Sequence, residues 1–111
     1  MTKLVKIISV NLKTTGQIIR DKREAKGLLL RELAASLKMD PAILSKLERG
    51  ERNPTKEQLI SISRLLDIEE KELVLSWISD KIVYYIADEE FGVEALKIAE
   101  EKVKYNKNKI K

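Results

Sequence analysis

The sequence contains no cysteine and no histidine. Their absence excludes a disulfide, a Cys/His zinc site, a thiol nucleophile and a histidine-based catalytic triad. No apolar run approaches the roughly 18 residues that a membrane span requires. A cluster of nucleophile, base and oxyanion donor is not visible either, nor is a glycine-rich phosphate loop. We therefore expect no enzyme, no metal or cofactor and no membrane association, and a reducing, cytoplasmic location.

Glycine, proline and aromatic residues are scarce, whereas charged residues are abundant. The 111 residues include 4 Gly, 2 Pro and 5% aromatics, against 43% hydrophobic and 36% charged residues. This composition favours a small all-α protein with short connections. The short apolar run Leu4–Val10 is broken by Lys6 and lacks a small-residue cleavage site. We interpret residues 1–13 as a strand-like or packed N-terminal extension, not a signal peptide.

The net charge of +4 is unevenly distributed. Residues 1–66 hold 14 Lys/Arg and 7 Asp/Glu, a net charge of +7, whereas residues 67–111 hold 8 and 11, a net charge of −3. A basic first part is typical of a module that binds a polyanion, followed here by a segment with another role. Chance clustering of charges on solvated helices explains the asymmetry equally well.

Helix-capping patterns mark the start of several segments. Thr14 with Gln17 and Thr55 with Gln58 have capping-box spacing, and Asp40-Pro41 combines an N-cap with a proline at the first helical position. Gly27 and Gly50 follow apolar periodic segments and are typical helix stops. These patterns and apolar spacing predict helices at about 17–26, 30–37, 41–49 and 55–66, a longer helix that opens near Glu69-Glu70 and runs through Ile86, and a last helix at 89–105, with a frayed basic tail at 106–111.

Two short helices joined by a tight turn, over residues 30–49, have the geometry of a helix-turn-helix. In the second helix Leu44 and Leu47 share one face, which we expect to be buried. The opposite face presents side chains that suit the major groove, which is about 12 Å wide. These outward residues are Ala42, Ile43, Ser45, Lys46 and Arg49.

The pair Leu33-Ala34 and the run LSKLERGERNP at residues 44–54 closely resemble the Cro/cI-type helix-turn-helix family, also called the XRE family. The resemblance covers roughly residues 15–75. It implies a five-helix, lambda-repressor-like DNA-binding domain, here with an additional C-terminal helix. It also implies a regulator that binds double-stranded operator DNA, commonly as a dimer.

Positions matched to the family suggest which residues contact DNA. Base reading is expected from Ala42, Ile43, Ser45 and Lys46. Phosphate binding is expected from Arg31, Arg49, Arg52, Asn53, Thr55 and Lys56. Glu48 is expected to hold the motif together through polar contacts. Arg20, Lys22, Arg23 and also Arg31 are interpreted as solvated charges more than as specific contacts, with the alternative that some of them reach the DNA backbone.

Three positions differ from the family's usual pattern. Leu29 stands where a capping Ser or Thr is usual, and Leu30 replaces a Gln that typically contacts phosphate. Lys38 replaces the usual turn glycine, which predicts a left-handed backbone conformation with a small energetic penalty. These differences leave the fold prediction unchanged but affect the identity of the operator.

The segment after the DNA-binding domain is predicted to join two copies of the chain. One helix-turn-helix covers only half of an operator, so a two-fold dimer benefits specificity. We predict a DNA-binding domain at 14–75, a dimerisation extension at 76–105 and the basic tail at 106–111. The expected dimer contacts are Trp77, Ile78, Ile82, Tyr85, Phe91, Ala95 and Ile98. Two alternatives remain: Trp77 is also a natural core anchor, and the last helix could instead close the core of a monomer.

These observations predict a sequence-specific transcriptional regulator, a repressor or autoregulator, that binds a palindromic operator as a homodimer. The alternative is a restriction–modification controller, or an antitoxin that binds a small partner toxin through its C-terminal helices. A chain this short leaves little room for a sensory domain, so we expect its own concentration to control it.

Overall fold

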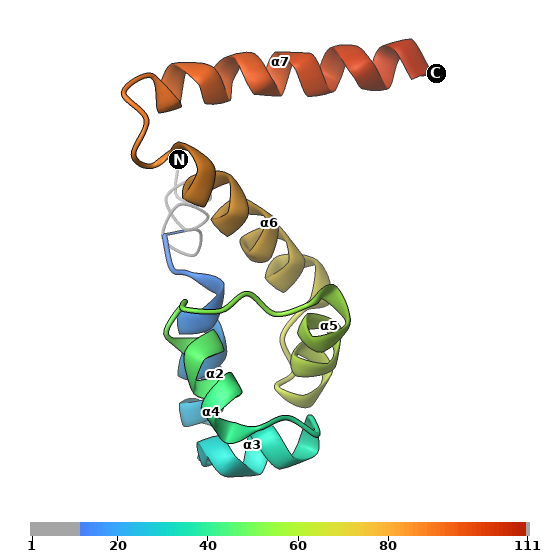
Figure 1. Cartoon of the computed structure of the whole chain (residues 1–111). Helices are drawn as coiled ribbons and strands as arrows, with labels where there is room; N and C mark the ends of the chain where they lie inside the picture. The colour runs from blue at the N-terminus through green and yellow to red at the C-terminus, as the bar shows by residue number, and fades with distance from the viewer. Residues whose placement is uncertain (1–11, 111) are drawn as a thin grey trace. The chain divides into compact units, whose positions relative to one another are not determined.

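The computed structural model describes residues 12–110, with side chains up to residue 108, and this part of the chain is all α-helical. The N-terminal arm expected at residues 4–10 lies outside the described residues. The prediction of an all-α fold is confirmed (Figure 1). The helices are α2 (Thr15–Ala25), α3 (Leu30–Ser36), α4 (Pro41–Glu48), α5 (Lys56–Leu65), α6 (Glu70–Ile86) and α7 (Gly92–Ile110).

The predicted N-caps are confirmed. Thr14 Oγ1 accepts a hydrogen bond from the Gln17 N–H, at 3.2 Å, so α2 begins two residues before the expected start. Thr55 and Gln58 form both bonds of a capping box, with donor–acceptor distances of 3.0 and 3.1 Å. At α4 the Asp40 carboxylate accepts from the N–H two residues later, and proline occupies the first turn. These bonds satisfy N–H groups that have no partner within a helix.

A residue with left-handed backbone conformation follows each of α2, α3, α4 and α5. Gly27 and Gly50 have φ of 70° and 77°, as their positions after the apolar segments predicted. Lys38 has φ of 55°, which confirms the left-handed turn expected where the family has glycine, and Asp67 has the same φ after α5. Each residue sits where a Schellman motif needs a left-handed backbone, which satisfies terminal carbonyl groups.

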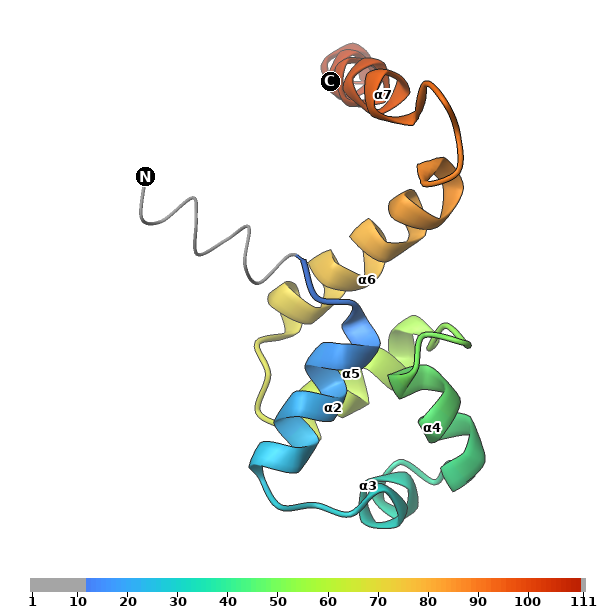
Figure 2. The same ribbon diagram turned by 90° about the vertical axis from the view of Figure 1, so that its left-hand side faces the viewer.

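Residues 12–80 form one compact unit around an apolar core. Helices α2 and α3 both pack against α4, and Figure 2 shows α3 and α4 as successive short helices joined by a tight turn. The buried apolar residues of this unit are Ile19, Leu33, Ala34, Leu44, Leu47, Leu59, Ile62, Leu66 and Leu73.

Residues from Lys81 onward form a second unit, which contains the end of α6 and all of α7. The last helix begins at Gly92, three residues later than predicted, because residues 87–91 form a turn in which the Gly92 N–H bonds to the Glu89 carbonyl at 3.1 Å. The tail expected to fray after residue 105 continues α7 to Ile110. Within residues 12–110, no helix combines the length and apolar character needed to cross a bilayer.

Candidate nucleic-acid interface

Helix α4 is anchored by two buried leucines and exposes the opposite face. Leu44 and Leu47 are 0% and 2% exposed, as predicted. Ala42 and Lys46 are exposed, and Ile43 and Ser45 are half-buried. The four side chains predicted to read bases therefore belong to a short helix whose inner face is fixed in the core. A rigidly held helix with a small, partly polar outer face is what entry into a major groove requires.

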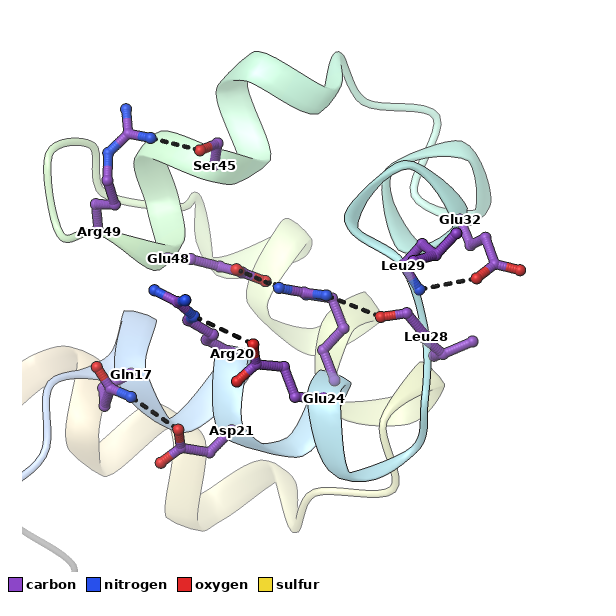
Figure 3. Close-up of polar contacts among 11 residues, drawn as sticks. Gln17, Arg20, Asp21, Glu24, Leu28, Leu29, Glu32, Ser45, Glu48 and Arg49 are labelled. Carbon is purple, nitrogen blue, oxygen red and sulfur yellow. Dashed lines mark hydrogen bonds and ion pairs between the residues drawn. The ribbon is translucent and has the colours of Figure 1, made fainter.

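Arg49 follows α4 and holds a polar network at its C-terminal end. Its Nη1 donates to the Ser45 hydroxyl at 2.6 Å, and its Nε donates to a Glu51 carboxylate oxygen at 2.6 Å (Figure 3 draws the Ser45 bond). The hydrogen bond and charge of Glu51 raise the pKa of Arg49, and the guanidinium lowers the pKa of Glu51 in turn. Arg49 remains half exposed, so its cation is oriented by the protein and accessible from solvent.

The loop between α4 and α5 carries further predicted phosphate contacts. Arg52 and Asn53 are exposed, while Pro54 next to them is buried. The Pro54 carbonyl accepts a hydrogen bond from Trp77 Nε1 at 3.0 Å, which fixes the loop to α6. The exposed pair therefore projects from a loop with a fixed base, which suits residues that position a duplex.

Thr55 and Lys56 mark the start of α5 and are both exposed. The N–H and hydroxyl of Thr55 are used in the capping box with Gln58. The N–H groups of the following first-turn residues have no acceptor within the helix, so they and the helix dipole favour an anion. Of the two predicted residues, Lys56 thus offers both an N–H and an ammonium to a phosphate, while Thr55 mainly shapes the terminus.

Arg31 lies in the first turn of α3 and is exposed. Leu29 before it provides no side-chain cap, as its apolar side chain predicted. The Glu32 carboxylate compensates in part by accepting from the Leu29 N–H at 2.8 Å, as Figure 3 shows. Helix α3 therefore begins with one of the two bonds of a capping box, the bond from the Leu29 N–H to the Glu32 carboxylate.

The interpretation of Arg23 as a solvated charge is wrong. Its Nε and Nη2 donate to the two carboxylate oxygens of Glu48 at 2.7 and 3.1 Å, and its Nη1 donates to the Leu28 carbonyl at 2.8 Å. The Glu48 carboxylate and the Leu28 carbonyl are drawn in this contact in Figure 3. The Arg23 and Glu48 side chains are only 11% and 5% exposed. Hydrogen bonding to Glu48 raises the pKa of Arg23.

This ion pair confirms the holding role predicted for Glu48 and identifies Arg23 as its partner, which the sequence did not indicate. It joins α2 directly to the end of α4, and through Leu28 it also joins the segment before α3. Glu48 faces inward in the motif, so a buried partner of opposite charge was needed somewhere. The sequence alone did not indicate which of the three basic residues of α2 supplies it.

The beginning of α2 also packs closely against α4. A Cβ on Gly16 would collide with the backbone carbonyl oxygens of Leu47 and Glu48, so glycine is needed there. An isolated glycine inside a helical segment often marks such a close approach, and this was the available signal. Next to it, Thr15 Oγ1 lies 3.0 Å from Ser76 Oγ, and its N–H donates to Asp80 at 2.8 Å. These contacts hold the start of α2, which packs against α4, in place against α6.

The residues predicted to form a dimer interface differ in exposure. Trp77 is half-buried, packs against the core and bonds to the loop before α5, as a core anchor would. Ile78 and Ile82 are 45% and 41% exposed. Tyr85, Phe91, Ala95 and Ile98 are exposed as well.

Comparisons with known proteins agree with this architecture. A model of the helix-turn-helix family (HTH_3) matches residues 19–73. Among solved structures, the restriction-modification controller protein C.AhdI from Aeromonas hydrophila is 37% identical, over 53% of this chain and 89% of that chain, with a TM-score of 0.50. The clp gene regulator ClgR from Corynebacterium glutamicum is 28% identical, over 82% of this chain and 83% of that chain, with a TM-score of 0.52. No curated protein matches the chain.

Proposed function

Because the chain belongs to the helix-turn-helix family of the Cro/cI (XRE) type, we propose that it regulates transcription by binding a double-stranded operator through α4. The observation that carries this proposal is the orientation of α4. Its two leucines are buried, while Lys46 and the adjacent small side chains face away from the core. A regulator of this kind acts by occupying DNA in the cytoplasm and needs no cofactor or catalytic group.

We assign base reading to Ala42, Ile43, Ser45 and Lys46. The Lys46 ammonium can donate to guanine O6 or N7, and the Ile43 side chain suits a thymine methyl group. Arg49 holds the Ser45 hydroxyl through Nη1, so Ser45 reaches a base only together with Arg49. Base preference at that step should therefore depend on both residues.

Phosphate binding is assigned to Arg31, Arg49, Arg52, Asn53, Thr55 and Lys56. These residues are exposed and lie on α3, the end of α4, the following loop and the start of α5. Side chains on both sides of a recognition helix commonly position the duplex without reading sequence. Binding should weaken steeply as salt rises, because each phosphate contact releases counterions.

Two copies of the chain should bind a palindromic operator. One recognition helix reads one half-site, and a two-fold dimer places two such helices about one helical turn of DNA apart. The exposed apolar residues after Trp77 supply candidate contacts for this dimer. A palindrome with half-site centres about 10 base pairs apart is the expected operator.

The similarity to C.AhdI favours one subclass of regulator, a controller of a restriction–modification system. Such a chain should select a duplex found upstream of its own gene and of adjoining nuclease or methyltransferase genes. An antitoxin would instead copurify with a small toxin at unit stoichiometry. The position of the selected operator and the proteins that copurify with the full chain separate these roles.

Selection of bound duplexes from a random library, followed by footprinting, tests the proposal. Lys46→Ala should cost about 1–3 kcal/mol of binding free energy and relax preference at one position in each half-site. Lys71→Ala is the matched control, because Lys71 is an exposed lysine of α6 with no assigned role in binding. If Lys46→Ala and Lys71→Ala had equal effects, or if no duplex were enriched, the proposal would be refuted.

A further inference from the structure

Helix α7 carries apolar side chains on one side, and these side chains are exposed. Every described side chain from residue 93 to residue 108 is exposed. Leu96, Ile98 and Val103 retain 40%, 57% and 56% of their accessible surface. At 100° per residue, these three and two neighbouring alanines fall within about half of the helix circumference, and Lys102 and Asn106 lie in the same half. A 19-residue amphipathic helix of this kind gains most of its stability from packing its apolar face.

The charges of this segment are divided by position along the chain. Residues 88–101 contain six acidic residues and one lysine, a net charge of −5. Residues 102–111 contain five lysines and no acidic residue, a net charge of +5. The first half of α7 and the turn before it are therefore acidic, and the second half is basic. The Glu100–Lys104 ion pair, at 3.1 Å, bridges the two halves within the helix.

From this pattern we propose that the α7 helices of two copies of the chain pair in antiparallel orientation, apolar face to apolar face, to form the homodimer. Antiparallel pairing places the acidic half of each helix beside the basic half of its partner. Parallel pairing would place like charges together along the whole helix, which is unfavourable. Antiparallel alignment also obeys a two-fold axis, so the same surface serves both copies.

The division of charge along α7 favours a second copy of the chain as the partner that covers this face. A partner of uniform charge, such as an anionic lipid surface or a duplex, would attract the basic half and repel the acidic half. Within α7 itself, residues 92–101 carry three acidic residues and one lysine, a net charge of −2, and residues 102–110 carry four lysines, a net charge of +4. The two ends of the helix therefore have opposite charges, and a second copy turned end to end satisfies both. This inference rests on the proposed function in one respect, since it supplies the dimer that a palindromic operator requires.

Charge reversal in the full chain tests the pairing without DNA. Glu94→Lys, Glu100→Lys and Glu101→Lys together make α7 basic throughout, and Lys102→Glu, Lys104→Glu and Lys107→Glu together make it acidic throughout. Sedimentation should show the wild-type chain as a dimer at micromolar concentration. Each triple variant should dimerise about ten- to a hundredfold more weakly, and an equimolar mixture of the two should form a heterodimer of near wild-type affinity.

Control variants separate this effect from loss of folding. Glu69→Lys with Glu72→Lys adds positive charge at the start of α6 and should leave the dimer unchanged. If a triple variant loses helix on its own, the mixture still decides, because the heterodimer restores both charge complementarity and helix content. A wild-type chain that is monomeric at 50 µM, a triple variant that dimerises like wild type, or a mixture without heterodimer would each overturn the proposal.

The orientation has its own test, because the chain has no native cysteine and a single introduced one can carry a spin label. In antiparallel helices, two labels at Glu94→Cys should lie about 20 Å apart along the axis. A chain labelled there and a chain labelled at Asn108→Cys should bring their labels within roughly 10 Å. Two Glu94→Cys labels at roughly 10 Å would indicate parallel pairing and refute the inference.

These outcomes are distinguishable from failure of the proposed function. A chain that is monomeric but still selects a single half-site would overturn the pairing and keep the DNA-binding role. A monomeric chain that binds vesicles containing phosphatidylserine through α7 would assign the face to lipid and also overturn the pairing. A dimer that pairs through α7 and selects no duplex would keep the inference and refute the proposed function.

Discussion

Replacing Glu48 by alanine removes one partner of the ion pair that joins α2 to the end of α4. Arg23 would then keep its bond to the Leu28 carbonyl but would lose both bonds to the carboxylate, with only 11% of its side chain exposed. Removal of one partner from a buried pair typically costs about 3–5 kcal/mol, because the remaining charge is left uncompensated. For a domain this small, that is a large share of the total free energy of unfolding.

Urea unfolding followed by tryptophan fluorescence measures this cost in the right part of the chain. Trp77 is the only tryptophan, and it packs against the core of the first unit. With a urea slope of about 1–2 kcal/mol per molar, the midpoint of Glu48→Ala should fall by roughly 2 M or more, or the unit should be unfolded without urea.

Glu24→Ala is the matched control on the neighbouring ion pair. Glu24 pairs with Arg20 at 3.6 Å, an ion pair that Figure 3 draws, and both side chains are about half exposed. Loss of this ion pair should lower the free energy of unfolding by less than about 1 kcal/mol, because solvent screens the attraction between exposed charges. Arg23→Met with Glu48→Leu should recover most of the stability lost in Glu48→Ala, since neither charge is then buried alone. Equal midpoints for Glu48→Ala and Glu24→Ala would refute the importance assigned to the buried pair.

Three further predictions concern the backbone and the pH dependence of stability. Gly16→Ala should lower the free energy of unfolding by about 1–3 kcal/mol or more, because its Cβ would meet backbone carbonyls of α4, and an unchanged urea midpoint would contradict this close packing. Lys38→Gly should raise the melting temperature and increase the free energy of unfolding by less than about 1 kcal/mol. The reason is that relief of the left-handed strain at φ 55° exceeds the entropy cost of glycine. A lower melting temperature would contradict this prediction. Stability should be flat from pH 6 to 8, since the chain has no histidine, and should fall below about pH 5. The reason is that hydrogen bonds from basic side chains lower the pKa of three carboxyls in the folded state. The stability that these carboxyls add is present above their unfolded pKa and is lost when they are protonated. A urea midpoint that rises in acid would contradict this prediction. The three carboxyls are Asp21, Glu51 and Asp67.

Local sequence patterns predicted most of the DNA-binding unit, because they depend on neighbours along the chain. The caps at Thr14, Asp40 and Thr55 and the left-handed turn at Lys38 involve contacts within a few residues. The buried face of α4 followed from helical spacing alone. Such short-range rules hold when the surrounding fold agrees with them, as it does here.

Contacts between distant segments could not be predicted in the same way. The partner of Glu48 lies 25 residues earlier in the chain, and Asp80 bonds to the start of α2 across 65 residues. Several basic residues on the first helix were equally plausible partners until the helices were placed. The extent of α7 was misjudged for a different reason, because the lysine-rich sequence after residue 105 has no apolar periodicity that would indicate a helix.

Entry of α4 into a duplex groove is the central requirement of the proposed function. Titration of the isotope-labelled chain with its selected operator, followed by amide chemical shifts at modest ionic strength, tests this claim residue by residue. The largest changes should fall on residues 42–46, on Arg49 and on residues 52–56, and they should shrink as salt is raised. Changes confined to residues 81–110, with α4 unaffected by a bound duplex, would contradict the account.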